Sequence, residues 1–240
     1  MSRKLRAVRL IAGLVAAYVA VLCFPQPFFV HSVSANGLTL YSDRPLPDAA
    51  ARDLLHRSSE KLAQSPLFRE HPGGRAFLCN SRWRQRLFFN RDYGVAGVSP
   101  YPLTTNVFLR DASVTDNRLI SPRGIPVPGS RTLDYFVAHE LTHQLTGRVL
   151  GPLGFYRLPK WVREGYADYV GKGSAFDYAA ARRALLDGAP EMDWQHSGLY
   201  LRFHLQVAHL LDHRHWTVDR LLHGPWPDPA TIDSEIRAGG

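Results

Sequence analysis

Hydrophobic residues near the start of the chain form one uninterrupted run, Leu10–Phe24, behind four basic residues, Arg3, Lys4, Arg6 and Arg9. With the apolar residues on either side, the run approaches the ~20 residues that a helix needs to span a bilayer. A basic flank before an apolar run is typical of a secretory signal or a signal-anchor. The basic flank should remain in the cytoplasm, so we expect the rest of the chain on the extracytoplasmic (periplasmic) side of a cell membrane.

The segment after this apolar run bears on whether a signal peptidase removes the run or the run stays as a membrane anchor. The small residues at 33–35 resemble a signal-peptidase site, and cleavage there would give a secreted product. However, they lie well past the apolar run and inside a predicted hairpin over residues 30–41, whose turn is Asn36-Gly37. Because a cut would remove one strand of this hairpin, we favour an uncleaved single-pass transmembrane helix.

Farther along the chain, the spacing of apolar residues predicts a mixture of short strands and helices first, and a series of helices later. Residues 47–64 carry apolar positions at helical spacing. Strands are predicted at 75–79, 104–110 and 117–121, a short helix at 81–88 and a Pro/Gly-rich loop at 122–130. Helices are predicted at 132–150, 159–171, 175–187, 197–213 and 218–223. Strands first and helices later indicate an α+β fold, with a small strand-rich N-terminal lobe and a helical lobe.

The length and composition of the chain suit one compact domain with a short appendage. The 240 residues are 45% hydrophobic and 21% charged, which is enough apolar material for a real core. We divide the chain into a basic flank and anchor over residues 1–29, one domain over 30–223 and a tail over 224–240. The tail is rich in Pro, Asp and Gly, so we expect it to be flexible.

The net charge and the two cysteines narrow the range of functions. A net charge of +8 is compatible with nucleic acid or an anionic membrane, but no basic stripe interleaved with aromatic residues is present. We therefore expect no nucleic-acid partner. Cys23 and Cys79 are too few for a disulfide framework, and neither has a second cysteine nearby for a thiolate metal site.

The strongest chemical signal is the motif His139-Glu140-Leu141-Thr142-His143 within the predicted helix 132–150. Residues four apart lie on one face of a helix, so both imidazoles can reach one ion at Zn–N distances of ~2.0–2.1 Å. Glu140 projects about 100° round the helix from His139 and can accept a proton from a water at the open coordination position. The surrounding apolar residues predict that this helix is largely buried, where a pair of histidines needs a partner such as a metal.

A second motif follows on the next predicted helix, after Pro159. Glu164 can supply the third ligand to a single Zn²⁺ ion and leave the fourth position for water or substrate. Asp168, one turn later on the same face, can accept the free ring N–H of a ligand histidine and fix its tautomer. Gly165 would let this helix approach the HExxH helix closely.

These two motifs together resemble those of the gluzincins, the thermolysin-like and aminopeptidase-like zinc metallopeptidases, and especially the small peptidase MA-like members. Pro159-x-Trp161-x-x-Glu164-Gly165 is similar to the signature of that group. The resemblance implies a strand-rich lobe whose edge strand lies beside the cleft, followed by a helical lobe, with an extended polypeptide substrate along the edge strand. Residues 105–110 or 117–121 could be that strand.

Gluzincins also supply a Tyr or His from a later helix to stabilise the oxyanion, and here the pattern leaves alternatives. The common alignment places Gln195 where Tyr is expected, so Tyr200 and His196 both remain candidates. A local excess of histidine follows, at 204, 209, 213 and 215. His209 and His213 are one turn apart, but they lack a suitably spaced acidic pair, so we interpret this group as packing and surface residues.

The sequence thus predicts a membrane-anchored zinc-dependent peptidase in which Glu140 assists the attack of water on a peptide bond. The alternative is a catalytically inactive gluzincin-like protein that keeps zinc and acts as an interaction module of the cell envelope. A purely structural zinc site is disfavoured, because structural sites usually close with four protein ligands and the motifs supply three.

Overall fold

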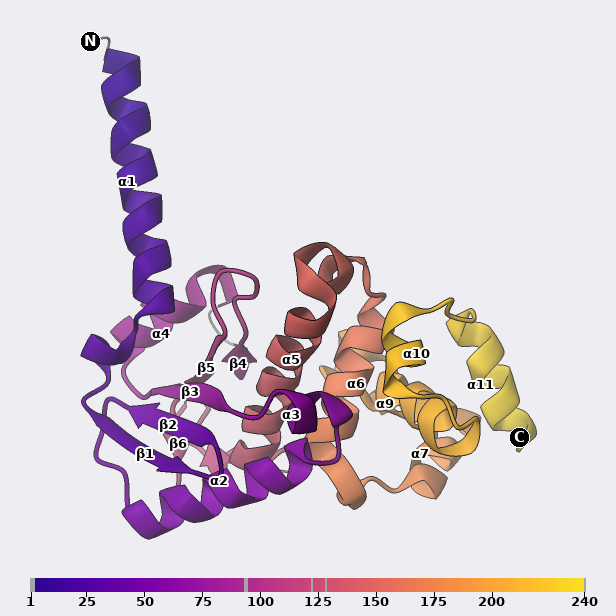
Figure 1. Cartoon of the computed structure of the whole chain (residues 1–240). Helices are drawn as coiled ribbons and strands as arrows, with labels where there is room; N and C mark the ends of the chain where they lie inside the picture. Colours follow the sequence, from indigo (N-terminus) through magenta and orange to yellow (C-terminus); the bar gives the residue numbers. More distant parts are fainter. Residues whose placement is uncertain (1–2, 93–94, 122, 128, 240) are drawn as a thin grey trace.

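The computed structural model describes residues 3–92, 95–121, 123–127 and 129–239. The first part of the chain contains, in order, α1 (Arg3–Cys23), η1 (Gln26–Phe28), β1 (His31–Ala35), β2 (Leu38–Ser42), α2 (Asp48–Leu62), α3 (Pro66–Glu70), β3 (Gly74–Cys79), α4 (Arg82–Phe89), η2 (Asn90–Asp92), β4 (Gly97–Val98), β5 (Asn106–Arg110), β6 (Ala112–Ser113) and β7 (Arg118–Leu119). The second part contains α5 (Leu133–Arg157), α6 (Lys160–Lys172), η3 (Gly173–Ala175), α7 (Tyr178–Leu186), η4 (Pro190–Met192), α8 (Trp194–Ser197), α9 (Leu201–Ala208), η5 (His209–His213), α10 (Val218–His223) and α11 (Pro229–Ala238). The predicted α+β class, with a small sheet first and helices later, is confirmed (Figure 1).

The main sheet is mixed and has the strand order β1-β2-β3-β5-β4. The predicted hairpin is confirmed: Ala35 pairs with Leu38 across a turn in which Asn36 and Gly37 have φ of 53° and 77°. Strands β2, β3 and β5 run parallel, and β4 closes the far edge antiparallel to β5. The pair β6–β7 forms a separate two-stranded sheet, so the strand predicted at 117–121 exists only as a short piece outside the main sheet.

Each face of the sheet is covered by helices, because successive side chains on a strand point to opposite faces. On one face, Phe77 and Phe108 pack against α4 and against the last turn of α1, which contributes the buried Leu22. On the other face, Leu78 and Leu109 pack beneath α2 and α5. The site described below lies on α5, beyond the edge of this second core.

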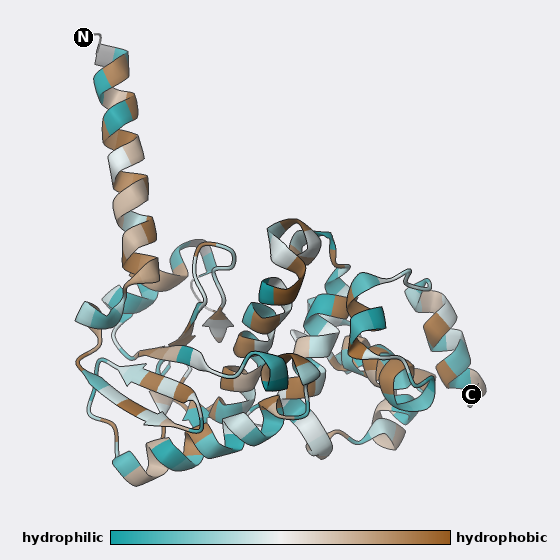
Figure 2. Ribbon diagram, viewed as in Figure 1, coloured by the Kyte–Doolittle hydropathy of each residue, from teal (hydrophilic) through white to brown (hydrophobic). Residues whose placement is uncertain are grey.

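Helix α1 leaves the domain and is buried only at its C-terminal end (Figure 2). Tyr18 donates to the carbonyl of Leu87 (3.0 Å), Asn106 donates to the carbonyl of Leu22 (2.8 Å), and Cys23 contacts the carbonyl of Leu103 (3.1 Å). The segment Lys4–Cys23 is long and apolar enough to cross a bilayer, and only 6% of its most apolar window is buried. By length and composition, α1 fits both a membrane span and a signal sequence.

The helical part is built around α6, which lies between α5 and α9. The expectation that Gly165 brings α6 close to the HExxH helix is wrong. A Cβ at Gly165 would lie 2.5 Å from the carbonyl oxygen of Phe203, so this glycine permits the close approach of α9 instead. Gly171 has the role predicted for Gly165, since a Cβ there would lie 2.9 Å from the ring of Tyr135 on α5.

Two helices differ from the predicted bounds for local reasons. Helix α5 continues to Arg157 past a kink at Gly151, whose φ of 67° a glycine adopts without strain. The helix predicted at 197–213 begins only at Leu201, as α9, and ends in the π-helical turn η5, because Gly198 ends the preceding α8 in the left-handed conformation.

The prediction of a flexible tail over 224–240 is wrong. Asp228 caps α11, Pro229 occupies its first turn, and Ile232 and Ile236 are fully buried. Arg202 on α9 also pairs with Asp233. The two isoleucines lie one turn apart and face α7 and α9, so tertiary packing orders a segment whose composition alone suggested flexibility.

Candidate metal centre

Three predicted ligands converge at the junction of α5 and α6. Nε2 of His139 and Nε2 of His143 lie 3.7 and 3.4 Å from Oε2 of Glu164, and the three ligand atoms are all within 4.8 Å of one another. Ligand atoms ~2.0–2.1 Å from a tetrahedral ion are ~3.3–3.4 Å apart. The three side chains therefore fit one zinc ion with only small movements.

The local sequence explains this convergence. His139 and His143 are one turn apart on α5, and their rings are nearly perpendicular, with centroids 4.9 Å apart. Helix α6 begins directly after Pro159, and its second turn brings Glu164 against the two imidazoles. The three side chains are only 7–12% exposed, so this corner is shielded from bulk water.

The histidines determine the charge state of Glu164, and Arg163 contributes to its orientation. Burial alone would raise the pKa of Glu164, but the charges and hydrogen bonds of His143 and His139 hold this pKa well below its usual value. Nε of Arg163 donates to Oε1 of Glu164 (3.3 Å), which leaves Oε2 directed at the imidazoles. Glu164 is therefore an anionic candidate ligand, and a hydrogen bond from Arg163 already holds one of its oxygens.

Glu140 is buried beside the three ligands, with 8% exposed surface. Burial, with a smaller contribution from the negative charge of Glu164, raises the pKa of Glu140 to about 7, although His143 acts in the opposite direction. The edge strand β4 lies directly against this carboxylate: a Cβ at Gly97 would be 2.8 Å from both Cγ and Oε1 of Glu140. A carboxylate in this environment can accept and return a proton near neutral pH.

Asp168 supports the site through an intermediate side chain rather than by direct contact with a ligand, which corrects the sequence prediction. Its carboxylate accepts a hydrogen bond from Tyr135, whose hydroxyl oxygen lies 3.4 Å from Nδ1 of His139. Its other oxygen pairs with Lys172 (2.7 Å) and His204 (2.9 Å). The hydroxyl of Tyr135 therefore lies between His139 and Asp168 and contacts both.

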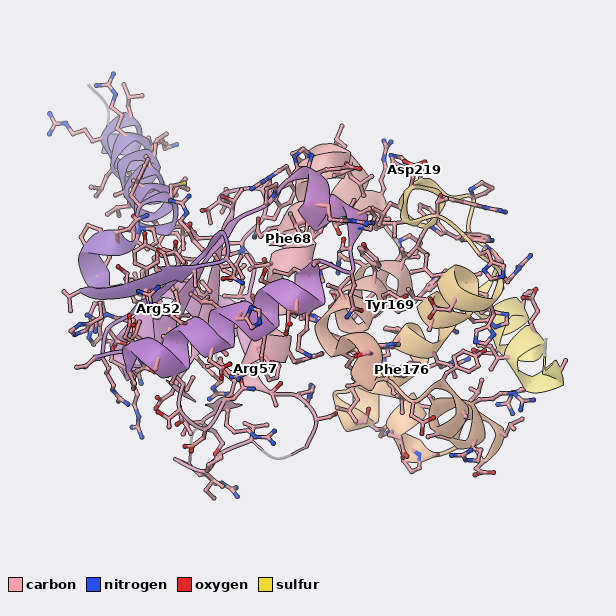
Figure 3. The ribbon with its side chains drawn as sticks, turned by 60° about the horizontal axis from the view of Figure 1, so that its bottom comes forward. Arg52, Arg57, Phe68, Tyr169, Phe176 and Asp219 are labelled. Atoms are coloured by element: carbon pink, nitrogen blue, oxygen red, sulfur yellow. The ribbon has the colours of Figure 1, made fainter. Side chains whose placement is uncertain are left out.

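The charge of Asp168 is stabilised by its partners. Burial would raise the pKa of Asp168, but the hydrogen bond from His204 and the charge of Lys172 hold it well below its usual value. Burial lowers the pKa of His204, which is neutral and donates through Nδ1. Tyr169 and Phe176, labelled in Figure 3, pack on the His204 ring with centroids 5.6 and 3.6 Å away.

The site opens into a cleft of about 720 Å³. Its walls are the edge strand β4 and the following residues, the first half and the C-terminal end of α5, the first half of α6, and the loop that carries Gly198 and Tyr200. Ser99, just after β4, donates to the carbonyl of Glu140 (2.9 Å) and accepts from Gln144 (2.7 Å), which ties the strand to α5. The strand beside the cleft is thus β4, and neither of the two candidates at 105–110 and 117–121; β5 is interior because β4 covers its outer edge.

The structure separates the two oxyanion candidates. The ring of Tyr200 stacks on that of His139 with centroids 6.0 Å apart and lines the cleft. Burial, followed by the charges of Glu164 and Glu140, raises the pKa of Tyr200, so its hydroxyl keeps its proton. His196 is not brought to the site: its side chain is 80% exposed and pairs with Asp193.

The remaining histidines form no second metal site in the described part of the chain. There, the cluster of His139, His143 and Glu164 is the single group of three or more ligand side chains close enough to share an ion. His209 contacts Tyr178 (2.9 Å) and Glu235 (3.3 Å), as expected for a packing residue.

Sequence reasoning missed Tyr135, Gly97 and Arg163. Tyr135 stands four residues before His139, on the same helical face, and this spacing was a signal that could have identified it. Gly97 had no sequence signal, because β4 has two residues and reaches α5 only through the sheet.

Comparison of the chain with protein-family models, with curated proteins and with solved structures gives no match.

Proposed function

We propose that this protein is a membrane-anchored zinc metallopeptidase that hydrolyses peptide bonds in extracytoplasmic polypeptides. The observation that supports it best is the convergence of His139, His143 and Glu164 on one point, with Glu140 beside them in the same cleft. Three protein ligands with a buried carboxylate are typical of a catalytic zinc site, which keeps one position open. The spacing of the motifs, similar to that of the gluzincins, agrees with this interpretation.

The side chains have distinct roles in the proposed reaction. Zinc, when bound, polarises the scissile carbonyl and makes a neighbouring water more acidic. Glu140 accepts the proton of the attacking water and passes it to the leaving amine. The protonated hydroxyl of Tyr200 donates a hydrogen bond to the developing oxyanion. Arg163 holds Glu164, and Tyr135 with Asp168 holds His139, so that the ligands keep their orientation.

The edge strand β4 offers a place for the substrate backbone. One side of β4 pairs with β5, and Gly97, Val98 and Ser99 line the cleft. An extended polypeptide can add to such an edge through main-chain hydrogen bonds. The absence of a side chain at Gly97 leaves the strand close to Glu140, so a peptide bond bound along β4 would lie next to the proposed base.

The test combines metal analysis with digestion of a peptide library by the full-length protein in detergent. Wild type should bind one zinc per chain and cleave peptides, whereas Glu140→Gln should bind zinc and cleave nothing. Glu60→Gln, on an exposed face of α2, is the matched control and should behave as wild type. Activity in Glu140→Gln, or a chain that binds no zinc, would refute the proposal. Stoichiometric zinc without cleavage by wild type would instead support a non-catalytic zinc-binding protein.

A further inference from the structure

The exposed part of α1 is too short to span a bilayer by itself. The fourteen residues at 4–17 are exposed, whereas Tyr18 to Cys23 pack against the domain, apart from the exposed Ala20. At ~1.5 Å per residue, the exposed part covers ~21 Å, against ~30 Å for the hydrocarbon core. If α1 spans the membrane, the packed turns must also lie at bilayer depth. The surface of the domain around them is then in contact with the headgroups.

Exposed apolar side chains lie beside the base of α1 and at the end of α5. We define this apolar face by Phe24, Leu103, Leu153 and Tyr156, whose exposed fractions are 71%, 50%, 74% and 61%. Two contacts link parts of this face: the thiol of Cys23, next to Phe24, donates to the carbonyl of Leu103 (3.1 Å), and Tyr156 donates to the carbonyl of Tyr101 (2.6 Å). Figures 1 and 2 show the apolar end of α5 on the side of the domain from which α1 leaves.

Basic and aromatic residues accompany the apolar face. Arg148 and Arg157 are exposed near the end of α5, and Trp83 is half exposed on α4, beside Phe28. Arginines near an anionic bilayer surface are attracted to it, and Trp and Tyr favour the interface. Large exposed apolar side chains with these neighbours are typical of a surface that contacts lipid.

The cleft of the candidate metal centre shares a wall with this same face. Tyr101, Phe155 and Tyr156 line the cleft, and Tyr156 also belongs to the apolar face. We propose that the apolar face rests on the bilayer surface and that the cleft opens there, so that the substrates are polypeptide segments adjacent to a membrane anchor. The proposed position of the apolar face depends on α1 being a membrane span. The proposed substrate class depends, in addition, on the proposed peptidase function.

The position of the face is tested with full-length protein in lipid nanodiscs containing anionic phosphatidylglycerol. A fluorophore is placed at Leu153→Cys, or at Leu186→Cys as control, in a Cys23→Ala background. Leu186 is exposed at the end of α7, on the side of the domain away from α1, and Cys79 is buried (Figure 1). Lipids spin-labelled near the headgroup should quench the fluorophore at 153 and not the one at 186. Equal quenching by an aqueous agent at both positions would overturn the proposal.

The substrate class is tested with one peptide in two forms, soluble and tethered to the nanodisc by a lipid. Wild type should cleave the tethered form more efficiently, because both partners share one surface, and Leu153→Glu should reduce this cleavage about tenfold without changing cleavage of the soluble form. Leu186→Glu should alter neither rate. Equal rates for both forms with wild type would exclude the substrate class. A chain that cleaves neither form refutes the peptidase function, whereas the quenching experiment still decides the position of the face.

Discussion

Replacement of Gly97 by alanine tests whether the distance between β4 and Glu140 matters for catalysis. The new Cβ would lie 2.8 Å from Cγ and Oε1 of Glu140 and from Cδ2 of Leu109. Ordinary contacts begin at 3.4 Å, so Glu140 or β4 must move by at least about 0.6 Å. The methyl group meets none of the three candidate zinc ligands within its nearest contacts, so zinc binding should remain.

The expected result is a large loss of rate with an intact fold. A misplacement of about 1 Å in a catalytic group costs about 100-fold, so the smaller shift here should lower kcat/KM by about 10- to 100-fold. The assay measures kcat/KM on a peptide, zinc per chain and the circular dichroism spectrum for the wild type and Gly97→Ala.

A second glycine on the sheet provides the control. A Cβ at Gly74 would lie 2.6 Å from the side chain of Leu141, on the core side of the same helix. Gly74→Ala should therefore lower the free energy of unfolding and leave kcat/KM per folded molecule within about twofold of wild type. If Gly97→Ala keeps wild-type kcat/KM, or if both variants lose the same activity, the assignment of Glu140 as the base pressed against β4 is refuted.

Three further predictions concern the support of the site and the C-terminal helix. Tyr200→Phe should lower kcat by about 10²–10³ with unchanged zinc content, and a wild-type kcat would remove Tyr200 from the mechanism. Tyr135→Phe should weaken zinc about 10- to 100-fold in a chelator competition, because His139 loses its link to Asp168; unchanged affinity would contradict the link. Ile232→Ala should lower the free energy of unfolding in urea by about 2–5 kcal/mol, and the exposed Thr231→Ala should have no such effect; equal stability of the two variants would mean that α11 is not packed as described.

Much of the candidate zinc site was predictable because its signals are local. The spacing of His139 and His143 places both on one face of a helix whatever the rest of the chain does. Pro159 marks the start of the next helix, and Glu164 lies in its second turn. The hairpin over 30–41 was predictable for the same reason, since Asn-Gly adopts the positive φ angles of a tight turn.

The wrong predictions concern places where segments that are far apart in the sequence pack together. Composition indicated a flexible tail, but α11 is ordered because Ile232 and Ile236 find an apolar surface on α7 and α9. Gly165 was assigned to the wrong neighbour, because a small residue indicates a close approach without specifying which helix approaches.

The sequence by itself determined the apolar anchor-like helix, the α+β order of elements and the identity of the candidate zinc ligands, because each depends on spacing within one element. Only the tertiary structure decided that β4 borders the cleft, that Tyr200 rather than His196 faces His139, and that Tyr135 connects His139 to Asp168. The physical reason is that periodicity specifies which face of an element is buried, whereas the partner of that face is selected by packing across the whole chain.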